Sequence, residues 1–130
     1  MKARKLTGWL SLGAVVLAGC APEVPQQVVV YTAVDKEVAQ PIFDAFTRQT
    51  AVEVVAHFAA DAPDAAGLPG VLRSERDQPR ADLFWNDELL QTLRLKQEGL
   101  LRVQPLAADA KYDPEHRSPD HDWWGFAARA

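Results

Sequence analysis

Two aspartates, Asp35 and Asp87, each follow a short apolar run and open a polar turn. Carboxylate oxygens suit hard cations such as ferric iron, so the pair can form part of a metal site. Aspartates in such places also serve as helix caps, because they accept hydrogen bonds from free N–H groups and meet the positive end of the helix dipole. If they are caps alone, the same helix starts can bind an anion instead. The residue types leave both interpretations open.

Cys20, the only cysteine, ends a segment with the features of an export signal. The start is basic, with Lys2, Arg4 and Lys5. Residues 6–17 are mainly apolar, a length typical of a signal-peptide core and too short to span a bilayer. The string Leu17-Ala18-Gly19-Cys20 resembles the lipobox of bacterial lipoproteins. We therefore expect residues 1–19 to be cleaved off, Cys20 to be acylated and anchored in the membrane, and residues 20–27 to form a tether.

The charge of the remaining chain argues against a nucleic-acid partner. The expected signal holds three of the 14 basic residues and none of the 18 acidic ones, which leaves a net charge of −7. A nucleic-acid-binding surface would be basic. An acidic surface is compatible with a cation as ligand. With Cys20 acylated no disulfide can form, so the roughly 110 residues after the signal must rely on one hydrophobic core.

Strands and helices alternate along the chain. Runs rich in β-branched and aromatic residues predict strands near 28–32, 52–58 and 81–85. Helical spacing predicts helices near 38–49, 69–77 and 87–98. The alternation predicts an α/β fold, a parallel sheet with helices on both faces. Ligands bind such sheets outside the carboxyl ends of the strands, at the expected turns 32–36, 58–67 and 85–88.

The first expected helix has an apolar face and an awkward proline. Pro41 fits best if the regular helix begins near Val38, which places the proline in the first turn. The apolar residues of this helix that share one face are Val38, Ile42, Ala45 and Phe46.

The third expected helix is bounded by turn-forming residues. Asn86 or Asp87 is expected to cap it, and Gly99 to end it. Residues 109–122 are expected to form a polar loop, and residues 123–130 to begin another strand. The sequence stops where that strand begins, which suggests a fragment of a longer protein.

Six strings, in this order and spacing, resemble the amino-terminal lobe of the ferric-iron-binding proteins of ABC importers, which are type II periplasmic binding proteins. The strings are Val30-Tyr31-Thr32, Phe46-Thr47-Arg48-Gln49-Thr50, Val52-Glu53-Val54, Ala81-Asp82-Leu83-Phe84-Trp85, Gly99-Leu100-Leu101 and Trp123-Trp124-Gly125-Phe126. The resemblance covers residues 27–130. It implies that residues 28–130 are one lobe of a two-lobe fold that holds solute between its lobes.

The resemblance implies a solute-binding protein, not an enzyme, that lies in the periplasm or at the cell surface and delivers ferric iron to a permease and its ATPase. Iron is then the transported ligand, and no resident cofactor is implied. Asp35 matches the position of a histidine or tyrosine ligand, and Asp87 that of a glutamate ligand, which is one methylene longer. Thr32 and Asn86, in the same two turns, are further expected ligand-binding residues. The paired tyrosines that complete the family's iron site would lie beyond residue 130.

Other functions stay open at this point. The solute can instead be an oxyanion, thiamine or a polyamine. A secreted metal-dependent hydrolase using His57, His116 or His121 is a further hypothesis, although these histidines lack a ligand motif and are expected at the surface. A structural lipoprotein without a ligand is another. The tryptophans that can either line a cleft or pack in the core are Trp85, Trp123 and Trp124.

Overall fold

The computed structural model describes residues 26–62 and 67–126. Three parallel strands, β1 (Gln27–Thr32), β2 (Glu53–Phe58) and β3 (Leu83–Trp85), form one sheet in the order β2-β1-β3. In the central strand, Val30 lies opposite Ala56 of β2 and Leu83 of β3. The predicted strands are confirmed to within two residues at each end. The expected signal, Cys20 and most of the tether lie outside the described residues.

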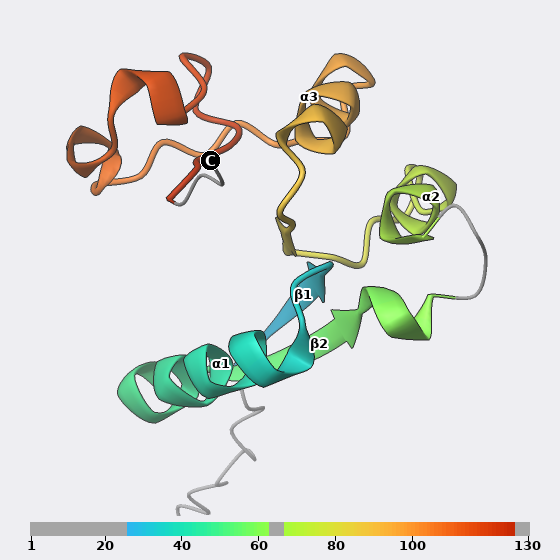
Figure 1. Cartoon of the computed structure of the whole chain (residues 1–130), viewed down its shortest axis with the longest axis vertical. Coiled ribbons are helices and arrows are strands. Elements are labelled where there is room, and N and C mark those ends of the chain that lie inside the picture. The colour runs from blue at the N-terminus through green and yellow to red at the C-terminus, as the bar shows by residue number, and fades with distance from the viewer. Residues whose placement is uncertain (1–25, 63–66, 127–130) are drawn as a thin grey trace, which may run out of the picture.

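Three helices accompany the sheet. They are α1 (Lys36–Thr50), α2 (Gly67–Ser74) and α3 (Leu89–Gln97). Figure 1 shows α1 on one face of the sheet and α2 and α3 on the other. The predicted α/β fold, a parallel sheet with helices on both faces, is therefore confirmed. Among the described residues, none of the helices has the length and apolar character needed to cross a membrane.

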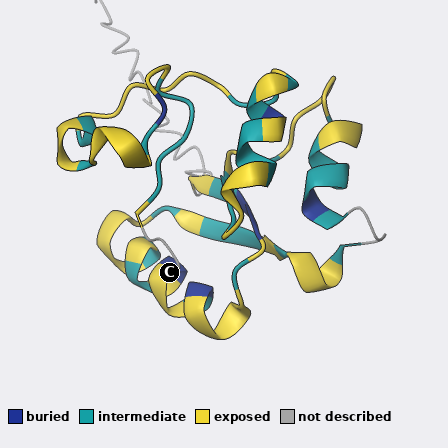
Figure 2. Cartoon of the chain, turned by 45° about the horizontal axis from the view of Figure 1, so that its top comes forward, coloured by how far each residue is buried: buried dark blue, intermediate teal, exposed yellow. Residues whose placement is uncertain are grey.

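The core follows from the alternation of β1. Val30 points to one face, where it packs with Ala39 and Phe43 of α1 in a buried cluster (Figure 2). Tyr31 points to the opposite face, toward the segment after α2, where its hydroxyl meets Glu75. Burying a side chain such as that of Phe43 contributes about 1.5–3 kcal/mol, so this cluster fixes α1 on the sheet.

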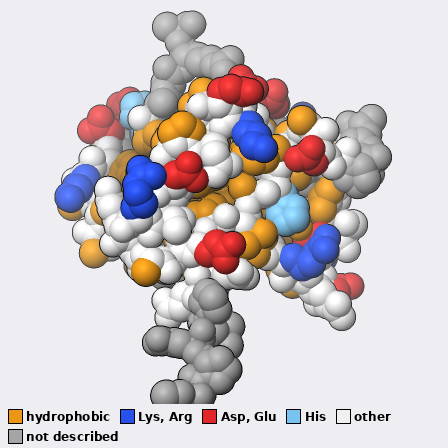
Figure 3. Space-filling model, turned by 90° about the horizontal axis from the view of Figure 1, so that it is seen from below, with side chains coloured by type: hydrophobic (Ala, Val, Ile, Leu, Met, Phe, Trp, Pro, Cys, Tyr) orange, Lys and Arg blue, Asp and Glu red, His pale blue; other side chains and the backbone are white. Residues whose placement is uncertain are grey.

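The apolar face predicted for α1 is real, but most of it is not the buried face. Val38, Ile42 and Phe46 remain 55%, 52% and 42% exposed. The sheet instead buries Ala39 and Phe43, which lie one position further along the helix. Figure 3, seen from the side on which α1 lies in Figure 1, shows apolar side chains interspersed with charged ones. The sequence pattern correctly predicted a helix with an apolar face. Packing against the sheet buries the adjacent face of that helix, which carries Ala39 and Phe43.

The expected start of α1 was also wrong. The carbonyl of Asp35 accepts hydrogen bonds from the N–H groups of Val38 and Ala39, at 3.0 and 2.9 Å, so the helix begins at Lys36. Pro41 consequently lies inside the helix and not in its first turn. The helix continues through the proline, with the buried residues Ala39 and Phe43 on either side of it, although the missing N–H removes one helical hydrogen bond.

The other two helices differ from their predicted bounds. α2 spans 67–74 where 69–77 was predicted, and α3 spans 89–97 where 87–98 was predicted. Gly99 ends α3 as expected: it has φ +70°, and the next N–H, that of Leu100, reaches back to the carbonyl of Leu95 at 3.0 Å.

The segment after α3 has short turns where a loop was predicted. Two further 3-10 turns, η2 (Asp109–Lys111) and η3 (Pro114–His116), follow the earlier η1 (Ala59–Asp61). The strand expected from residue 123 is present only as an isolated antiparallel bridge between Arg117 and Trp124. Residues 127–130 lie outside the described part of the chain.

Candidate functional site

The turn between β3 and α3 is organised by Asn86. The Glu88 N–H donates to the Asn86 Oδ1 at 2.7 Å, and the Asn86 Nδ2 donates to the Thr92 Oγ1 at 2.9 Å. Glu88, not Asn86 or Asp87, occupies the N-cap position of α3 and makes no side-chain cap bond. The predicted cap was therefore misplaced, because Asn86 uses its side chain within the turn that precedes the helix.

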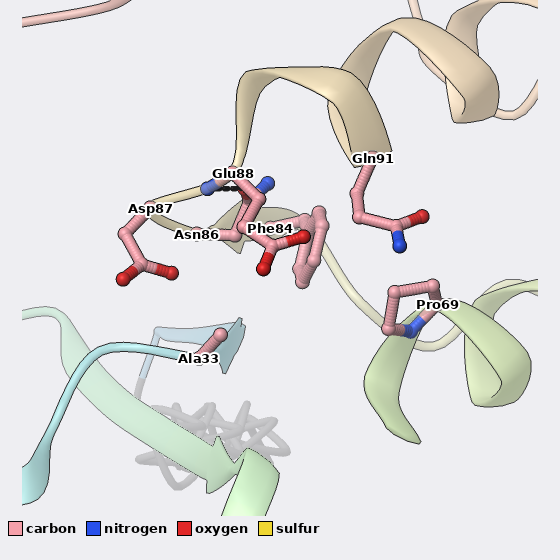
Figure 4. Close-up of a pocket in the computed structure, with 7 residues that line it drawn as sticks. All are labelled: Ala33, Pro69, Phe84, Asn86, Asp87, Glu88 and Gln91. Carbon is pink, nitrogen blue, oxygen red and sulfur yellow. Dashed lines mark hydrogen bonds between the residues drawn. The ribbon is translucent and has the colours of Figure 1, made fainter. Parts of the chain in front are cut away.

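A pocket of about 200 Å³ opens at this turn, at the carboxyl ends of β1 and β3. β1 and β3 are joined there by a hydrogen bond from the Ala33 N–H to the Trp85 carbonyl, at 3.0 Å. The residues that line the pocket are Ala33, Pro69, Phe84, Asn86, Asp87, Glu88 and Gln91 (Figure 4). The site edge expected for a parallel sheet is thus hollowed in this structure.

The pocket lining is acidic and partly apolar. Asp87 and Glu88 contribute carboxylates, Gln91 contributes an amide, and Phe84 and Pro69 contribute apolar surface. In Figure 4 both carboxylates point from the turn toward Ala33 on the opposite side. None of the seven lining residues is basic, so the lining attracts cations and repels anions.

The structure brings together two of the four predicted ligand-binding residues. Asn86 and Asp87 line the pocket, whereas Thr32 and Asp35 do not. Thr32 is fully buried, and its Oγ1 accepts a hydrogen bond from the Val34 N–H at 3.1 Å. Asp35 is exposed at the N-cap position of α1, without a side-chain cap bond. Asp35 therefore occupies the position expected of a helix cap, but its side chain makes no capping hydrogen bond in this structure.

Sequence reasoning missed Glu88 and Gln91 as pocket residues. The expected turn 85–88 already contained Glu88, and the rule that ligands bind at strand ends could have selected it. Gln91 lies in the first turn of α3, and no pattern in the sequence separates it from an ordinary helix residue.

One ion pair and one further hydrogen bond join the helices that form the pocket walls. Arg73 of α2 binds Glu98 just after α3 through two hydrogen bonds, at 2.7 and 2.9 Å. The neighbouring Arg76 donates to the Glu98 carbonyl at 2.9 Å. These contacts join α2, which carries Pro69, to α3, which carries Gln91. They are partly exposed, so they fix geometry more than they add stability.

A second network lies beneath α2. The buried Tyr31 hydroxyl donates to the Glu75 carboxylate, 3.0 Å from each oxygen, and Arg80 pairs with the same carboxylate. Burial and the bond to Glu75 raise the pKa of Tyr31. Burial alone would raise the pKa of Glu75, but the hydrogen bonds from Arg80 and Tyr31 outweigh it and leave that pKa lowered. Glu75 is therefore a half-buried carboxylate that its partners keep charged.

The histidines do not form a metal centre. His57 and His116 are exposed, as expected, while His121 is half-buried with its Nδ1 2.6 Å from the Asp109 carboxylate. In the described residues, no group of three or more His, Cys, Asp or Glu side chains has the arrangement to hold a metal ion. Any ferric iron here would need ligands beyond these.

Of the tryptophans considered as cleft or core residues, Trp85 packs in the core. Trp85 stacks edge-on against Phe43, with ring centroids 5.9 Å apart, and joins the core cluster. The Trp124 Nε1 donates to Asp109 at 2.6 Å, and neither Trp123 nor Trp124 lines the pocket.

The fold of the described residues is similar to part of the chain of several solved binding proteins. Solved ferric-iron-binding proteins share the fold, so the resemblance expected from sequence is confirmed at that level. No protein-family model matches the chain, and no curated protein matches it.

Three solved structures illustrate the likeness. The Trichodesmium protein IdiA (FutA), in complex with iron and citrate, has 24% identity and a TM-score of 0.65. Ferric iron-binding protein A of Mannheimia haemolytica, in an open conformation, has 19% identity and a TM-score of 0.68. Iron-bound HitA of Pseudomonas aeruginosa has 23% identity and a TM-score of 0.64. The alignments cover 77%, 77% and 78% of this chain and 31%, 30% and 32% of those proteins, so the chain spans about a third of their length.

Proposed function

We propose that this chain is part of the extracytoplasmic solute-binding component of an ABC importer, and that its transported ligand is ferric iron. The observation that carries the proposal is the pocket at the strand ends, lined by two carboxylates and by no basic side chain. Ferric iron is a hard cation that prefers anionic oxygen, which Asp87 and Glu88 offer. Three proteins named for binding iron share the fold.

The pocket lining weighs against the oxyanion alternative. An anion would meet the carboxylates of Asp87 and Glu88, and none of the other five residues that line the pocket is basic. A polyamine or thiamine is cationic and stays compatible with the charge. These organic cations are therefore the competing ligands in the test.

The described residues supply only part of an iron site. Two carboxylates leave most of the coordination sphere to water or to other groups, and the chain spans about a third of the similar proteins. Water that reaches the ion weakens each electrostatic contact. We therefore expect this chain to bind ferric iron weakly, and a chain extended to the length of those proteins to bind it far more tightly.

Calorimetric titration tests the proposal. Ferric citrate, spermidine and thiamine are titrated into this chain and into the extended chain, where only ferric citrate should give strong heat. Asp87→Ala should weaken that binding, Asp35→Ala tests the second predicted ligand, and Asp113→Ala, an exposed residue outside the pocket, is the matched control. Tight binding of spermidine would refute ferric iron as the ligand. Tight binding of ferric iron by the short chain would show that the site has been misplaced.

The cellular part of the proposal rests on the sequence. We propose that residues 1–19 direct export, that Cys20 holds the chain in the membrane through lipid, and that a permease and an ATPase complete the importer. The competing hydrolase hypothesis predicts turnover that a chelator abolishes, whereas a binding protein should show ligand binding without turnover.

A further inference from the structure

The Asn86 side chain is held at both ends within its own turn. Its oxygen accepts from the Glu88 N–H at 2.7 Å, and its nitrogen donates to the Thr92 hydroxyl at 2.9 Å. Asn86 is half-buried, although it borders the pocket. Turning this amide toward a solute would break at least one of the two bonds.

The two bonds bracket the acidic residues of the pocket. Asn86 and Glu88 lie on either side of Asp87, and the bond between them closes the turn around that residue. Thr92 lies in the body of α3, so the second bond attaches the turn to that helix. Thr92 itself does not line the pocket.

We propose that Asn86 is a positioning residue of the pocket, which acts through Thr92 to hold Asp87 and Glu88 in place, and that it does not contact the solute. The inference rests on the proposed function, because it assumes that the pocket binds a cation. If Asn86 acts in this way, Thr92 affects the affinity for solute although it lies outside the pocket. Groups that orient metal ligands without touching the metal typically change affinity about 10–100-fold when removed.

The test uses the full 130-residue chain in detergent and terbium(III) as probe. Terbium(III) is a soluble trivalent hard cation that takes oxygen ligands, as ferric iron does. Its emission is sensitised by nearby indole, and Trp85 directly precedes Asn86 in the chain. The emission that is lost in the Asp87→Asn variant comes from terbium(III) bound in the pocket. The dissociation constant of terbium(III) is measured from this part of the emission.

We expect Thr92→Val and Asn86→Ala each to raise this dissociation constant about tenfold. The double variant should be no weaker than Asn86→Ala alone, because that change already removes the bond to Thr92. Thr92→Ser keeps the hydroxyl and should restore affinity. Thr47→Val, the same change in the body of α1, should leave affinity unchanged. Thr92→Ala replaces Thr92→Val if the valine variant unfolds in a thermal melt.

Two outcomes separate the inference from the function beneath it. If Asn86→Ala weakens binding while Thr92→Val and Thr92→Ala leave it unchanged, Asn86 does not act through Thr92 and the proposed positioning role is refuted. If wild type and Asp87→Asn give the same emission, the pocket holds no cation, and the proposed function is overturned together with the inference.

Discussion

Glu75 shows how one half-buried carboxylate links charge to stability. Its side chain is 10% exposed, and the Tyr31 hydroxyl and Arg80 both donate to it. Its pKa in the folded chain is lowered from the ordinary value of 4.5. A lowered pKa means that the carboxylate stabilises the fold fully above pH 4.5, and that this contribution is lost as the pH falls through the folded pKa.

We predict that Glu75→Gln lowers the free energy of unfolding by about 1.5–3 kcal/mol near neutral pH, because charged hydrogen bonds are replaced by neutral ones. The difference from wild type should shrink in acid, where Glu75 is itself protonated. Urea denaturation at neutral and acidic pH measures both values. Glu115→Gln, at an exposed site, is the control. An equal difference at both pH values would contradict the role of the charge.

Ala51, the C-cap of α1, is strained. It has φ +59°, a left-handed conformation that costs a residue with a Cβ about 1–2 kcal/mol, and its N–H donates to the Thr47 carbonyl at 2.9 Å. We predict that Ala51→Gly raises the free energy of unfolding by about 0.5–1 kcal/mol, since glycine adopts this conformation freely but loses more entropy on folding. Thermal melts of the two chains measure the change. A lower melting temperature for the glycine variant would contradict the prediction.

At the scale of elements, Lys96 anchors the segment after α3. Its Nζ donates to the Ser118 hydroxyl and to Asp120, each at 2.7 Å, and to Asp122 at 3.1 Å. The bond to Asp120 is the largest cause of the raised pKa of Lys96, so the lysine stays protonated in the physiological range. A protonated amine cannot act as a base toward Ser118. The contacts of Lys96 with Ser118, Asp120 and Asp122 are therefore structural, and they hold this segment against α3.

We predict that Lys96→Met releases residues 117–124 from α3 while the sheet stays intact. The methionine keeps most of the apolar stem but makes none of the three hydrogen bonds. Hydrogen exchange should show faster exchange at the Ser118 N–H, which donates to the Trp123 carbonyl, and unchanged exchange in β1. Lys111→Met, at an exposed site, is the matched control. Unchanged protection at Ser118 would show that backbone bonds alone hold the segment.

Regular elements could be predicted from sequence, and the contacts that position them could not. The strands were predictable because β-branched runs carry a local signal, as in Val28-Val29-Val30. Residues 109–122 were predicted as a loop because they are polar and contain prolines. Their attachment to α3 was not predictable, because Lys96 lies 24 residues before Asp120. The same holds for the candidate site. The position of Asp87 at the end of a strand could be predicted from the sequence, whereas the bond from Asn86 to Thr92 could be found only in the structure.

At the scale of the whole molecule, we predict that the chain is anchored through Cys20. Cys20→Ser should leave the protein unprocessed or soluble, because serine lacks the thiol that accepts a diacylglycerol. Labelling cells with a radioactive fatty acid checks this, and wild type alone should carry the label. Ser11→Ala within the expected signal is a control that keeps the thiol. Equal label on wild type and Cys20→Ser would show that the cysteine is not acylated.

The parallel pairing of the sheet also constrains when the chain can fold. β1 comes first in sequence, yet its partners lie about 26 residues later in β2 and about 53 residues later in β3. Neither pair among the three described strands can therefore close as a hairpin, and the entropy of closing each loop must be overcome before either pairing contributes. The leading part of the chain has no sheet partner until the middle has emerged. A protein that crosses a membrane as an extended thread gains time from this delay, because it reaches the far side before it folds.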